Sequence, residues 1–320
     1  MKRVVCFGEA LIDFLNTGQT QEGDLALNTF TQFPGGAPAN AAVAAAKLGG
    51  NAAFAGQVGG DPFGQFLVDS LERYGVDTSL TLVHPEAPTA LAFVFLDKSG
   101  ERSFAFRRYQ TADVVVEKEQ VDAAWYADEP IFHFCSNTLT DGSIADVTRY
   151  AVAEARRHGA LVSFDVNLRH NLWQAGRADA ELVNELVHCA DVVKFSREEI
   201  DYLSEGDLQT YLGNCFAGGL TAALITDGAG DMSIHTAASN ATVSPPAVDV
   251  VDTTGGGDAF IGAVLYGLSQ QPDPLDFLAD VAQLQRLVAS AAHCGAWAVA
   301  RRGAFPAFPT FADVENTWDV

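Results

Sequence analysis

Short runs of β-branched and aromatic residues alternate with helical patterns along most of this chain, and this alternation restricts the fold more than any other feature. Beyond about residue 130, the sequence predicts strands at residues 131–135, 160–165, 191–195 and 221–226. The helices predicted among them cover 143–158 and 179–189, or begin near Ser196 and at Asp258. Alternation of this kind favours a right-handed, mostly parallel sheet with helices on both faces, which is a three-layer α/β fold.

The N-terminal third adds an antiparallel pattern to this alternation. Residues 89–97 and 101–107, joined around 98–100, are predicted to form a hairpin. Leu91, Phe93 and Phe95 alternate with smaller residues, as Phe104 does with Phe106, and we expect one apolar face from them. No repeat or linker divides the chain. The prediction is therefore a single α/β domain over residues 1–320, with a small β-sheet lid formed by about 14–34 and 88–112.

Charge and cysteine content narrow the choice of partners. The 19 Lys and Arg against 41 Asp and Glu give a net charge of −22, which argues against nucleic acid as a partner. No apolar run approaches the roughly 20 residues that span a bilayer, and the N-terminus reaches Gly8 too soon for a signal peptide. The five cysteines form no Cys-x-x-Cys pair and the seven histidines no His-x-x-x-His pair. We expect a soluble cytoplasmic protein with reduced thiols and no membrane partner.

Residues 252–263, which read Asp-Thr-Thr-Gly-Gly-Gly-Asp-Ala-Phe-Ile-Gly-Ala, carry the strongest chemical signal. The start of a helix presents unpaired N–H groups, and the preceding glycines let a phosphate or an oxyanion approach them. Asp258 lies in the first turn, where it can accept a proton from a hydroxyl that attacks a phosphoryl group. Beside the positive end of the helix, Asp258 is expected to stay ionised, with an ordinary pKa of ~3.9. The alternative is a flexible turn that ends in a helix-capping acid.

A second motif, Gly35-Gly36-Ala37-Pro38-Ala39-Asn40, opens another predicted helix. Its two glycines allow a ligand to approach the backbone, and Asn40 on the first turn can both donate to and accept from a sugar hydroxyl. The alternative is an ordinary helix start with an incidental Asn.

Polar residues also follow the predicted strands at their carboxyl ends, where open α/β sheets bind ligands. They are Asp13 just beyond the first strand, then 165–169, 194–199 and 226–230. Each could alternatively be an ordinary strand–helix turn. The sequence has no Gly-Lys dipeptide, no His-Arg-Asp loop and no Gly-x-Gly-x-x-Gly after the first strand. These absences disfavour a P-loop NTPase, a protein kinase and a dinucleotide-dependent oxidoreductase.

In these residues the chain resembles the ribokinase-like (PfkB) family of carbohydrate kinases. Both of that family's signature regions have a counterpart here, at 35–40 and 252–263, and the likeness extends over nearly the whole length. The family's Gly-Ala-Gly-Asp stands here as Gly255-Gly256-Gly257-Asp258, which keeps the backbone donors. The resemblance implies a ribokinase-like fold and the transfer of a phosphoryl group from MgATP to a hydroxyl of a small sugar.

The resemblance also implies roles for individual residues. Asp258 would be the catalytic base, and the amides of Gly255, Gly256 and Gly257 would form the anion hole. The sugar would be held by Asp13, Gly35, Gly36 and Asn40, and the ATP site would include Lys194, Thr226, Gly228 and Gly230. Glu199 matches the acid of a motif that positions hydrated Mg²⁺, although Ser196 replaces the family's Asn. A K⁺ ion, which members often bind, would lie near Asp252 and Thr254.

Within the family, the sequence is most similar to fructokinases. Phe106-Arg107-Arg108 and Asp165-x-Asn167-x-Arg169 carry this similarity, but 2-keto-3-deoxygluconate kinases share much of it. In those enzymes, arginines that match Arg108 and Arg169 would bind the acidic sugar or phosphates. Arg108 could instead be a solvated charge at the end of a hairpin. Transfer to a primary hydroxyl, giving fructose 6-phosphate, is the expected reaction. The alternatives are a kinase of the same family for 2-keto-3-deoxygluconate, ribose or a nucleoside, and, more distantly, a non-catalytic sugar or nucleotide sensor. We also expect a homodimer through the lid, because an exposed apolar sheet face favours association.

Overall fold

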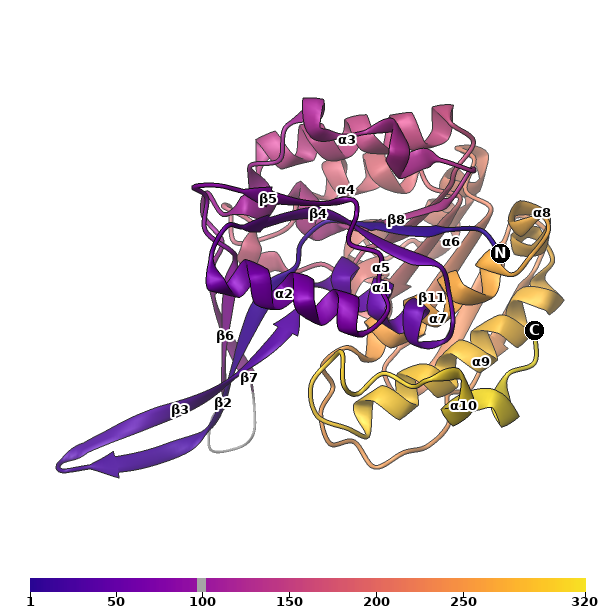
Figure 1. Cartoon of the computed structure of the whole chain (residues 1–320). Coiled ribbons are helices and arrows are strands. Elements are labelled where there is room, and N and C mark those ends of the chain that lie inside the picture. The colour runs from indigo at the N-terminus through magenta and orange to yellow at the C-terminus, as the bar shows by residue number, and fades with distance from the viewer. Residues whose placement is uncertain (97–101) are drawn as a thin grey trace.

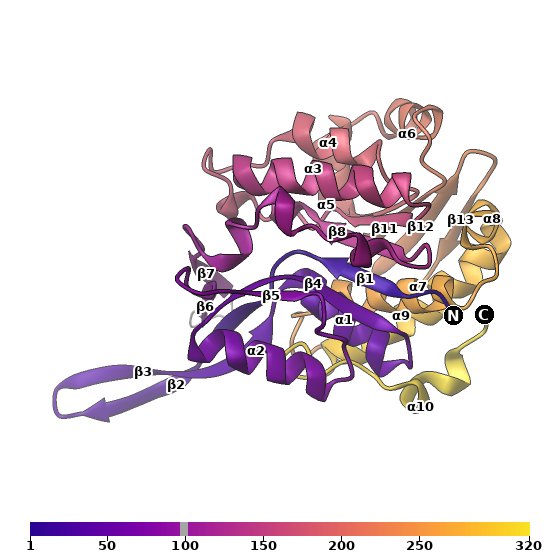
Figure 2. The same cartoon turned by 45° about the horizontal axis from the view of Figure 1, so that its top comes forward.

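A nine-stranded sheet organises the computed structural model, which describes residues 1–96 and 102–320 (Figures 1 and 2). The strand order is β13-β12-β11-β10-β9-β8-β1-β4-β5, and the seven strands from β11 to β5 are all parallel. The remaining two strands extend one edge in antiparallel pairing. The strands are β1 (Val4–Phe7), β4 (Ala52–Gly59), β5 (Thr81–His84), β8 (Ile131–Cys135), β9 (Leu161–Asp165), β10 (Val192–Ser196), β11 (Ala222–Asp227), β12 (Gly230–Thr236) and β13 (Asn240–Val243).

Helices cover both faces of this sheet, as the alternation predicts, and each face has its own hydrophobic core. In β1, Val4 and Cys6 face the core under α1, α7 and α9, whereas Val5 and Phe7 face the core under α3 to α6. None of the helices in the described part of the chain combines the length and the apolar character needed to cross a membrane. The helices are α1 (Ala37–Lys47), α2 (Pro62–Arg73), α3 (Gly142–Arg157), α4 (Ala180–Val187), α5 (Arg197–Ser204), α6 (Leu208–Ala217), α7 (Gly256–Ser269), α8 (Pro274–Ala279), α9 (Val281–Val299) and α10 (Phe311–Val314).

A second, four-stranded sheet lies beside the main one, in the order β3-β2-β6-β7. Its strands are β2 (Leu11–Glu22), β3 (Leu25–Gly35), β6 (Leu91–Leu96) and β7 (Arg102–Arg107). The β2–β3 hairpin projects from the body as a long arm (Figure 1). This sheet is the predicted small sheet, although its first strand begins at Leu11 rather than near residue 14. The hairpin turn predicted at 98–100 lies outside the described residues.

The expectation of one apolar face on the small sheet is wrong, because the sheet has two. Phe93 pairs with Ala105 and Phe106 pairs with Ala92, so Phe93 and Phe106 point to opposite faces. Residue alternation gives the period within each strand. It does not give the register across a hairpin, and a slip of one residue exchanges the faces.

The outer face of the small sheet carries four phenylalanine rings. Phe14 stacks on Phe93 with ring centroids 5.2 Å apart. Phe30 meets Phe93 and Phe95 edge-on, at centroid distances of 5.8 and 5.5 Å. The four rings are only partly buried, and we call this surface the outer phenylalanine face. The other face of the sheet turns toward the body, and on the outer phenylalanine face Phe14 also meets Phe63 of α2 edge-on, with ring centroids 5.8 Å apart.

Residues 226–230 differ from the expected strand–helix turn. Gly228, with φ of 54°, lies in a tight turn between β11 and β12, which run antiparallel. Strand β4 was not predicted from the sequence at all. Its residues are buried throughout and several are small, so that it shows no alternation that a pattern could detect.

Helices α1 and α7 pack at very close range, and glycine makes this approach feasible. A Cβ on Gly262 of α7 would lie 2.4 Å from Cβ of Ala44 and 2.8 Å from the carbonyl oxygen of Ala41. Both atoms belong to α1, so neither can move without shifting the helix. The pairing of these two helices brings the two sequence motifs together.

Replacing Gly262 by Ala is therefore expected to lower the free energy of unfolding by roughly 1–3 kcal/mol through overpacking. Gly213→Ala is the matched control, because Gly213 is exposed on α6 and a Cβ there would meet nothing within 4 Å. That substitution should raise stability by roughly 0.5–1 kcal/mol, because Ala favours the helix. Urea unfolding of both variants tests the contact, and wild-type stability of Gly262→Ala would contradict it.

Candidate active site

The N-terminus of α7 forms a cradle that only glycine can build. Gly255 precedes the helix with φ of 75°, a conformation that other residues rarely adopt. A Cβ on Gly255 would lie 2.8 Å from the Phe308 ring, and one on Gly256 would lie 2.6 Å from Cγ1 of Val299. The first N–H groups of a helix have no partner within that helix. Such a helix start can accept an anion at close range, and the anion hole at Gly255 to Gly257 stays a prediction.

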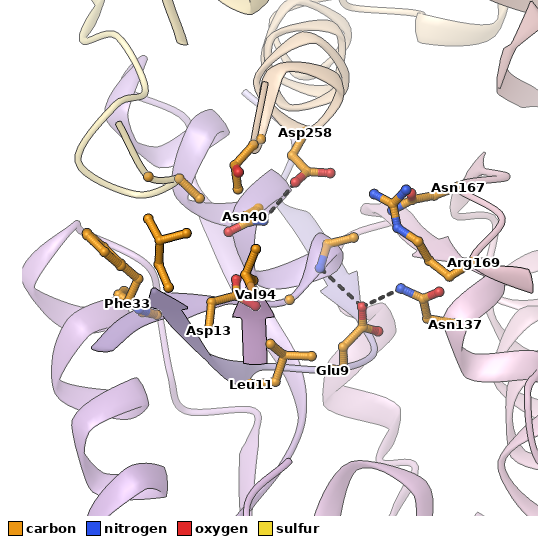
Figure 3. Close-up of a pocket in the computed structure, with 18 of the residues that line it drawn as sticks. Glu9, Leu11, Asp13, Phe33, Asn40, Val94, Asn137, Asn167, Arg169 and Asp258 are labelled. Atoms are coloured by element: carbon orange, nitrogen blue, oxygen red, sulfur yellow. Dashed lines mark hydrogen bonds between the residues drawn. The ribbon is translucent and has the colours of Figure 1, made fainter. Parts of the chain in front are cut away.

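Asp258 is the third residue of α7, and one hydrogen bond joins it to the second motif. Its Oδ2 accepts a hydrogen bond of 2.7 Å from Nδ2 of Asn40 in α1. Gly36, just before α1, has φ of 105°, and a Cβ there would lie 2.4 Å from the carbonyl oxygen of Glu9. The glycines of both motifs thus let the backbone pass close to its neighbours, and Asn40 and Asp258 meet between them (Figure 3).

The pKa of Asp258 differs from the ordinary value expected from the sequence. Burial raises the pKa of this carboxyl group, while the Asn40 hydrogen bond and the charges of Lys194 and Arg169 oppose the rise. The pKa expected from the sequence considered only the positive helix end, because the sequence does not show that the Asp258 side chain is buried. Asp258 is consequently a stronger base than an exposed Asp.

Two cavities meet at Asp258. The first, of about 440 Å³, lies between the small sheet and the body, and we call it the lid cavity. The second, of about 330 Å³, lies beside the start of α7, and we call it the helix-end cavity. Both are lined by Asn167, Arg169, Thr253, Gly255 and Asp258. A group bound in one cavity can therefore react with a group bound in the other.

The lid cavity contains buried polar atoms without a hydrogen-bond partner in the described chain. They are Oδ1 of Asn40, Oδ1 of Asn137 and Nη2 of Arg108. Such atoms are costly unless a ligand or water satisfies them. Two acceptors and one cationic donor suit a small ligand that carries several hydroxyl groups.

Arg108 is buried, which excludes a solvated charge at a hairpin end. Its side chain is 5% exposed and its Nε lies 2.5 Å from Oδ2 of Asp113, which is 1% exposed. Nη1 donates to the carbonyl oxygen of Asn137 at 2.9 Å and to the Thr140 hydroxyl at 3.0 Å. Three groups thus fix the guanidinium and aim it at the lid cavity.

Glu9 and Asn137 line the lid cavity but were not predicted as site residues. Oε1 of Glu9 accepts hydrogen bonds from Asn137 Nδ2 at 2.8 Å and from the Ala37 amide at 3.1 Å (Figure 3). Burial raises the pKa of Glu9, with Arg108 opposing the rise. Each residue follows the carboxyl end of a main-sheet strand, β1 or β8. That position was a usable signal, but after β1 it was assigned to Asp13, and it was not applied to the residues after β8.

Asp13 lines the lid cavity from a different element than expected. It is the third residue of β2 in the small sheet rather than part of the loop after β1. A Cβ on Gly35 would lie only 2.1 Å from Oδ2 of Asp13, so glycine at position 35 leaves room for this carboxylate. Sheet residues and body residues therefore face each other across one cavity.

Of the residues predicted to bind the nucleotide and its metal ion, some line the helix-end cavity and others lie outside both cavities. Lys194 and Glu199 line the helix-end cavity, together with Gly257. Both carboxylate oxygens of Glu199 accept backbone hydrogen bonds, from Leu168 at 2.8 Å and from Ser196 at 2.6 Å. Thr226 pairs with Ser196 in the sheet, at the same edge. Thr226, Gly228 and Gly230 line neither of the two cavities.

Asp252 fixes the loop that precedes α7. Its Oδ1 accepts a hydrogen bond of 2.8 Å from the Thr254 amide, and its Oδ2 accepts one of 3.1 Å from the Gly303 amide. Among the residues that the structure describes, no three His, Cys, Asp or Glu side chains are grouped so as to hold a metal ion.

Comparison with known proteins agrees with this geometry. The family model described as pfkB family carbohydrate kinase matches residues 1–310. The chain is 37% identical over 316 residues to probable fructokinase-5 of Arabidopsis thaliana, covering 98% of this chain and 96% of that protein.

Solved structures show the same similarity. A fructokinase from Xylella fastidiosa with bound ATP is 41% identical, with a TM-score of 0.92 over 98% of this chain and 97% of that one. A double mutant of the fructokinase from Vibrio cholerae O395, in a form with fructose, ADP and potassium ion bound, is 34% identical, with a TM-score of 0.88 over 100% and 99% of the two chains. The family match spans both motifs and both cavities, and the chain therefore belongs to the pfkB family of carbohydrate kinases.

Proposed function

We propose that this protein is a fructokinase that transfers the γ-phosphoryl group of MgATP to the primary hydroxyl of fructose, giving fructose 6-phosphate. The observation that carries the proposal is the position of Asp258 between a cavity with unpartnered hydrogen-bonding atoms and a cavity at a glycine-built helix start. Fructose and ATP or ADP are the ligands named for the similar fructokinase structures.

The lid cavity would hold the sugar. Asp13 can accept hydrogen bonds from two hydroxyl groups, and the free Oδ1 of Asn40 can accept another. Arg108 would donate through Nη2, while Gly35 and Gly36 keep the backbone close to the ligand. These contacts would place one hydroxyl beside Asp258.

Asp258 would act as the general base. As the hydroxyl oxygen forms its bond to the γ-phosphorus, the bond from phosphorus to the β-phosphate oxygen breaks, ADP leaves, and the hydroxyl proton passes to Asp258. The amides of Gly255 to Gly257 would stabilise the charge on the transferring group. Arg169 lines both cavities and could contact either the sugar or the phosphates.

The helix-end cavity and the strand ends beside it would receive ATP. Gly255 and Gly257 line this cavity at the start of α7, where backbone amides can bind phosphate oxygens, so the residues present fit the nucleotide. Thr226, Gly228 and Gly230 would contact the nucleotide beyond the phosphates. Bound Mg²⁺ would neutralise phosphate charge, with Glu199 reaching it through water, and the loop held by Asp252 and Thr254 would contribute to a K⁺ site.

The charges in the lid cavity favour fructose over 2-keto-3-deoxygluconate. Arg108, which would have to bind the sugar carboxylate, is already paired with Asp113, and Glu9 lies close enough to stabilise its charge. Asp13 adds a carboxylate to the same cavity. An acidic sugar would therefore meet several like charges and a neutralised Arg108, which leaves Arg169 as the other arginine lining this cavity. A neutral sugar avoids that cost.

The small sheet would act as a lid over the sugar. Its inner face supplies Asp13, Val94 and Phe106 to the cavity wall, while Asp258 and Asn40 belong to the body. Closure of apolar side chains over the reacting hydroxyl would exclude water and so limit the hydrolysis of ATP.

The first prediction for the activity concerns the substrate. With MgATP and K⁺, the protein should release ADP with fructose, and much less with 2-keto-3-deoxygluconate, ribose or adenosine. Phosphorus NMR of the product should show the phosphate on a primary carbon. Asp258→Asn should lower turnover by roughly 10²–10⁴-fold because the base is lost. It should leave fructose binding largely intact. The lost turnover of this variant also controls for contaminating kinases, which would still release ADP.

Other outcomes of this assay would change the proposal. Preference for the keto acid would mean that Arg108 and Arg169 bind the carboxylate of the sugar. Binding of fructose and ATP without product would support a sensor. Near-wild-type turnover of Asp258→Asn would remove Asp258 from the role of base.

The raised pKa of Asp258 predicts a particular pH dependence. The base works only when ionised, so activity should fall as the pH drops through its pKa. Asn40→Ala removes a hydrogen bond that lowers this pKa, so the pKa should rise further and the acid limb of kcat/KM should move to higher pH. Asn137→Ala is the control, because Asn137 donates to Glu9 instead. An acid limb that stays in place in Asn40→Ala would contradict this account.

We also propose that two copies associate through the small sheet. The arm formed by β2 and β3 is a two-stranded ribbon, which is marginally stable alone. Near its tip, Leu25 is 65% exposed and Leu27 is 39% exposed. The outer phenylalanine face is a second partly exposed apolar surface, on the other side of β3 from Leu25 and Leu27, and a second copy of the small sheet would cover it.

Phe30→Glu should therefore convert a dimer into a monomer at micromolar concentration, because it places a charge in the proposed interface. Leu275→Glu is the matched control: Leu275 is 45% exposed on α8, at the far side of the body from the arm (Figure 2). Sedimentation velocity should show a dimer for the wild type and for Leu275→Glu. A wild-type monomer would end the proposal.

A further inference from the structure

We infer that Asn137 is a specificity-determining residue of the lid cavity, whose Oδ1 accepts a hydrogen bond from a sugar hydroxyl, and that Glu9 is the positioning residue that fixes its orientation. Asn137 lies in the short 3₁₀ helix that follows β8 (Ser136–Leu139) and is 7% exposed. The inference rests on the proposed function and deepens it, because it names the chemical group that this part of the cavity selects, a hydroxyl rather than a carboxylate.

Glu9 holds one end of the Asn137 side chain (Figure 3). Nδ2 of Asn137 donates a hydrogen bond of 2.8 Å to Oε1 of Glu9. The same Oε1 accepts a hydrogen bond of 3.1 Å from the Ala37 amide, so it is an acceptor whether or not the other carboxyl oxygen carries a proton. Only an N–H group can therefore face Glu9, and Oδ1 of Asn137 lies on the opposite side of the amide.

The backbone of Asn137 is fixed as well. Its carbonyl oxygen accepts hydrogen bonds of 2.9 Å from Nη1 of Arg108 and from Oγ1 of Thr140. Arg108 is in turn bound to the buried Asp113. Because the carbonyl oxygen and Nδ2 are both engaged, Asn137 cannot turn its amide without breaking these contacts, and Oδ1 has one stable orientation.

This arrangement leaves two polar atoms over. Oδ1 of Asn137 and Nη2 of Arg108 are buried without a hydrogen-bond partner among the residues that the structure describes, and both residues line the lid cavity. Buried polar atoms in this state are unfavourable until a bound group satisfies them. Nη2 needs an acceptor and Oδ1 needs a donor, and hydroxyl groups can provide both.

A carboxylate cannot satisfy both atoms. It only accepts hydrogen bonds, so it suits Nη2 of Arg108 but opposes Oδ1 of Asn137, acceptor against acceptor. A site whose polar atoms need a substrate hydroxyl rejects an analogue without it, because the polar atom then stays buried and unpaired. Asn137 therefore selects fructose by hydrogen-bond polarity. This selection is separate from the one by charge, which comes from Asp113 and Asp13.

Asn137→Leu tests the selection, because leucine fills a similar space without hydrogen-bonding atoms. At saturating MgATP, the KM for fructose should rise roughly ten- to a hundredfold while kcat stays within about threefold of the wild-type value. The inhibition constant of 2-keto-3-deoxygluconate against fructose should change by less than about threefold. Asn137→Ala should give the same result and cannot overpack the cavity wall. A wild-type KM for fructose, or equal losses for both sugars, would overturn the inference.

Fructose analogues with one hydroxyl replaced by fluorine test the direction of the hydrogen bond, since fluorine cannot donate. In the wild type, the analogue altered at the hydroxyl that meets Asn137 should bind roughly tenfold more weakly than fructose. In Asn137→Leu, the same replacement should weaken binding by less than about threefold, because the partner is already gone. Penalties that are equal in the two proteins for every analogue would contradict a hydrogen bond to Asn137.

Two variants of Glu9 test positioning. Glu9→Gln keeps an oxygen that can accept from Asn137 and Ala37, so the KM for fructose should stay within about threefold of the wild type. Glu9→Leu removes the acceptor and should raise this KM roughly tenfold with little change in kcat. Added to Asn137→Leu, it should cost less than about threefold more, because Glu9 acts through Asn137. A full further loss in the double variant would remove Glu9 from this role.

Asn184→Leu is the matched control. Asn184 belongs to α4, its Oδ1 accepts a hydrogen bond of 2.7 Å from the Tyr211 hydroxyl, and it lines neither cavity. The constants for both sugars should therefore stay at wild-type values. Wild-type protein that phosphorylates no sugar would overturn the proposed function and this inference together. Wild-type protein that phosphorylates fructose, with Asn137→Leu behaving identically, would overturn this inference alone.

Discussion

The site depends on the close packing of α1 against α7. Asn40 and Asp258 are separated by 218 positions in the chain, yet a hydrogen bond of 2.7 Å joins them. It can form because Gly262 lets the two helices approach until a single added carbon would collide. The rigidity of the site therefore derives from apolar packing well behind it, and the polar groups that face the cavities add specificity to a geometry that is already fixed.

The electrostatics of the site follow from burial rather than from net charge. Acidic residues predominate in the chain, but each buried acid near the cavities has a defined partner: Asp113 has Arg108, Asp165 has Lys194, and Glu9 has an amide and Asn137. For Asp165 and Glu9, burial raises the pKa of the carboxyl group, and these partners oppose that rise. Such a site can place the hydroxyl groups of a bound alcohol next to protein cations. A reaction between a neutral alcohol and a highly charged phosphate requires both.

Much of the fold and part of the site could be predicted from the sequence because they depend on local patterns. The β8 strand, the helix that begins near Ser196 and the glycine-rich start of α7 each follow from a few neighbouring residues. The two faces of the small sheet and the place of Asp13 could not be predicted, because strand register and the pairing of β2 with β6 are long-range properties. Glu9 was missed for a related reason, since an acid after a short strand acquires meaning only when Ala37 and Asn137 meet it.

The division of the lid cavity between two parts of the molecule has a thermodynamic consequence. Asp13 belongs to the small sheet, and Asn40 and Asp258 belong to the body. If the two parts move relative to each other, a ligand that bridges them binds tightly only to the closed population, and the measured dissociation constant is the intrinsic one divided by the closed fraction. Substitutions in the arm, far from any bound sugar, could then change sugar affinity without altering a single contact to it.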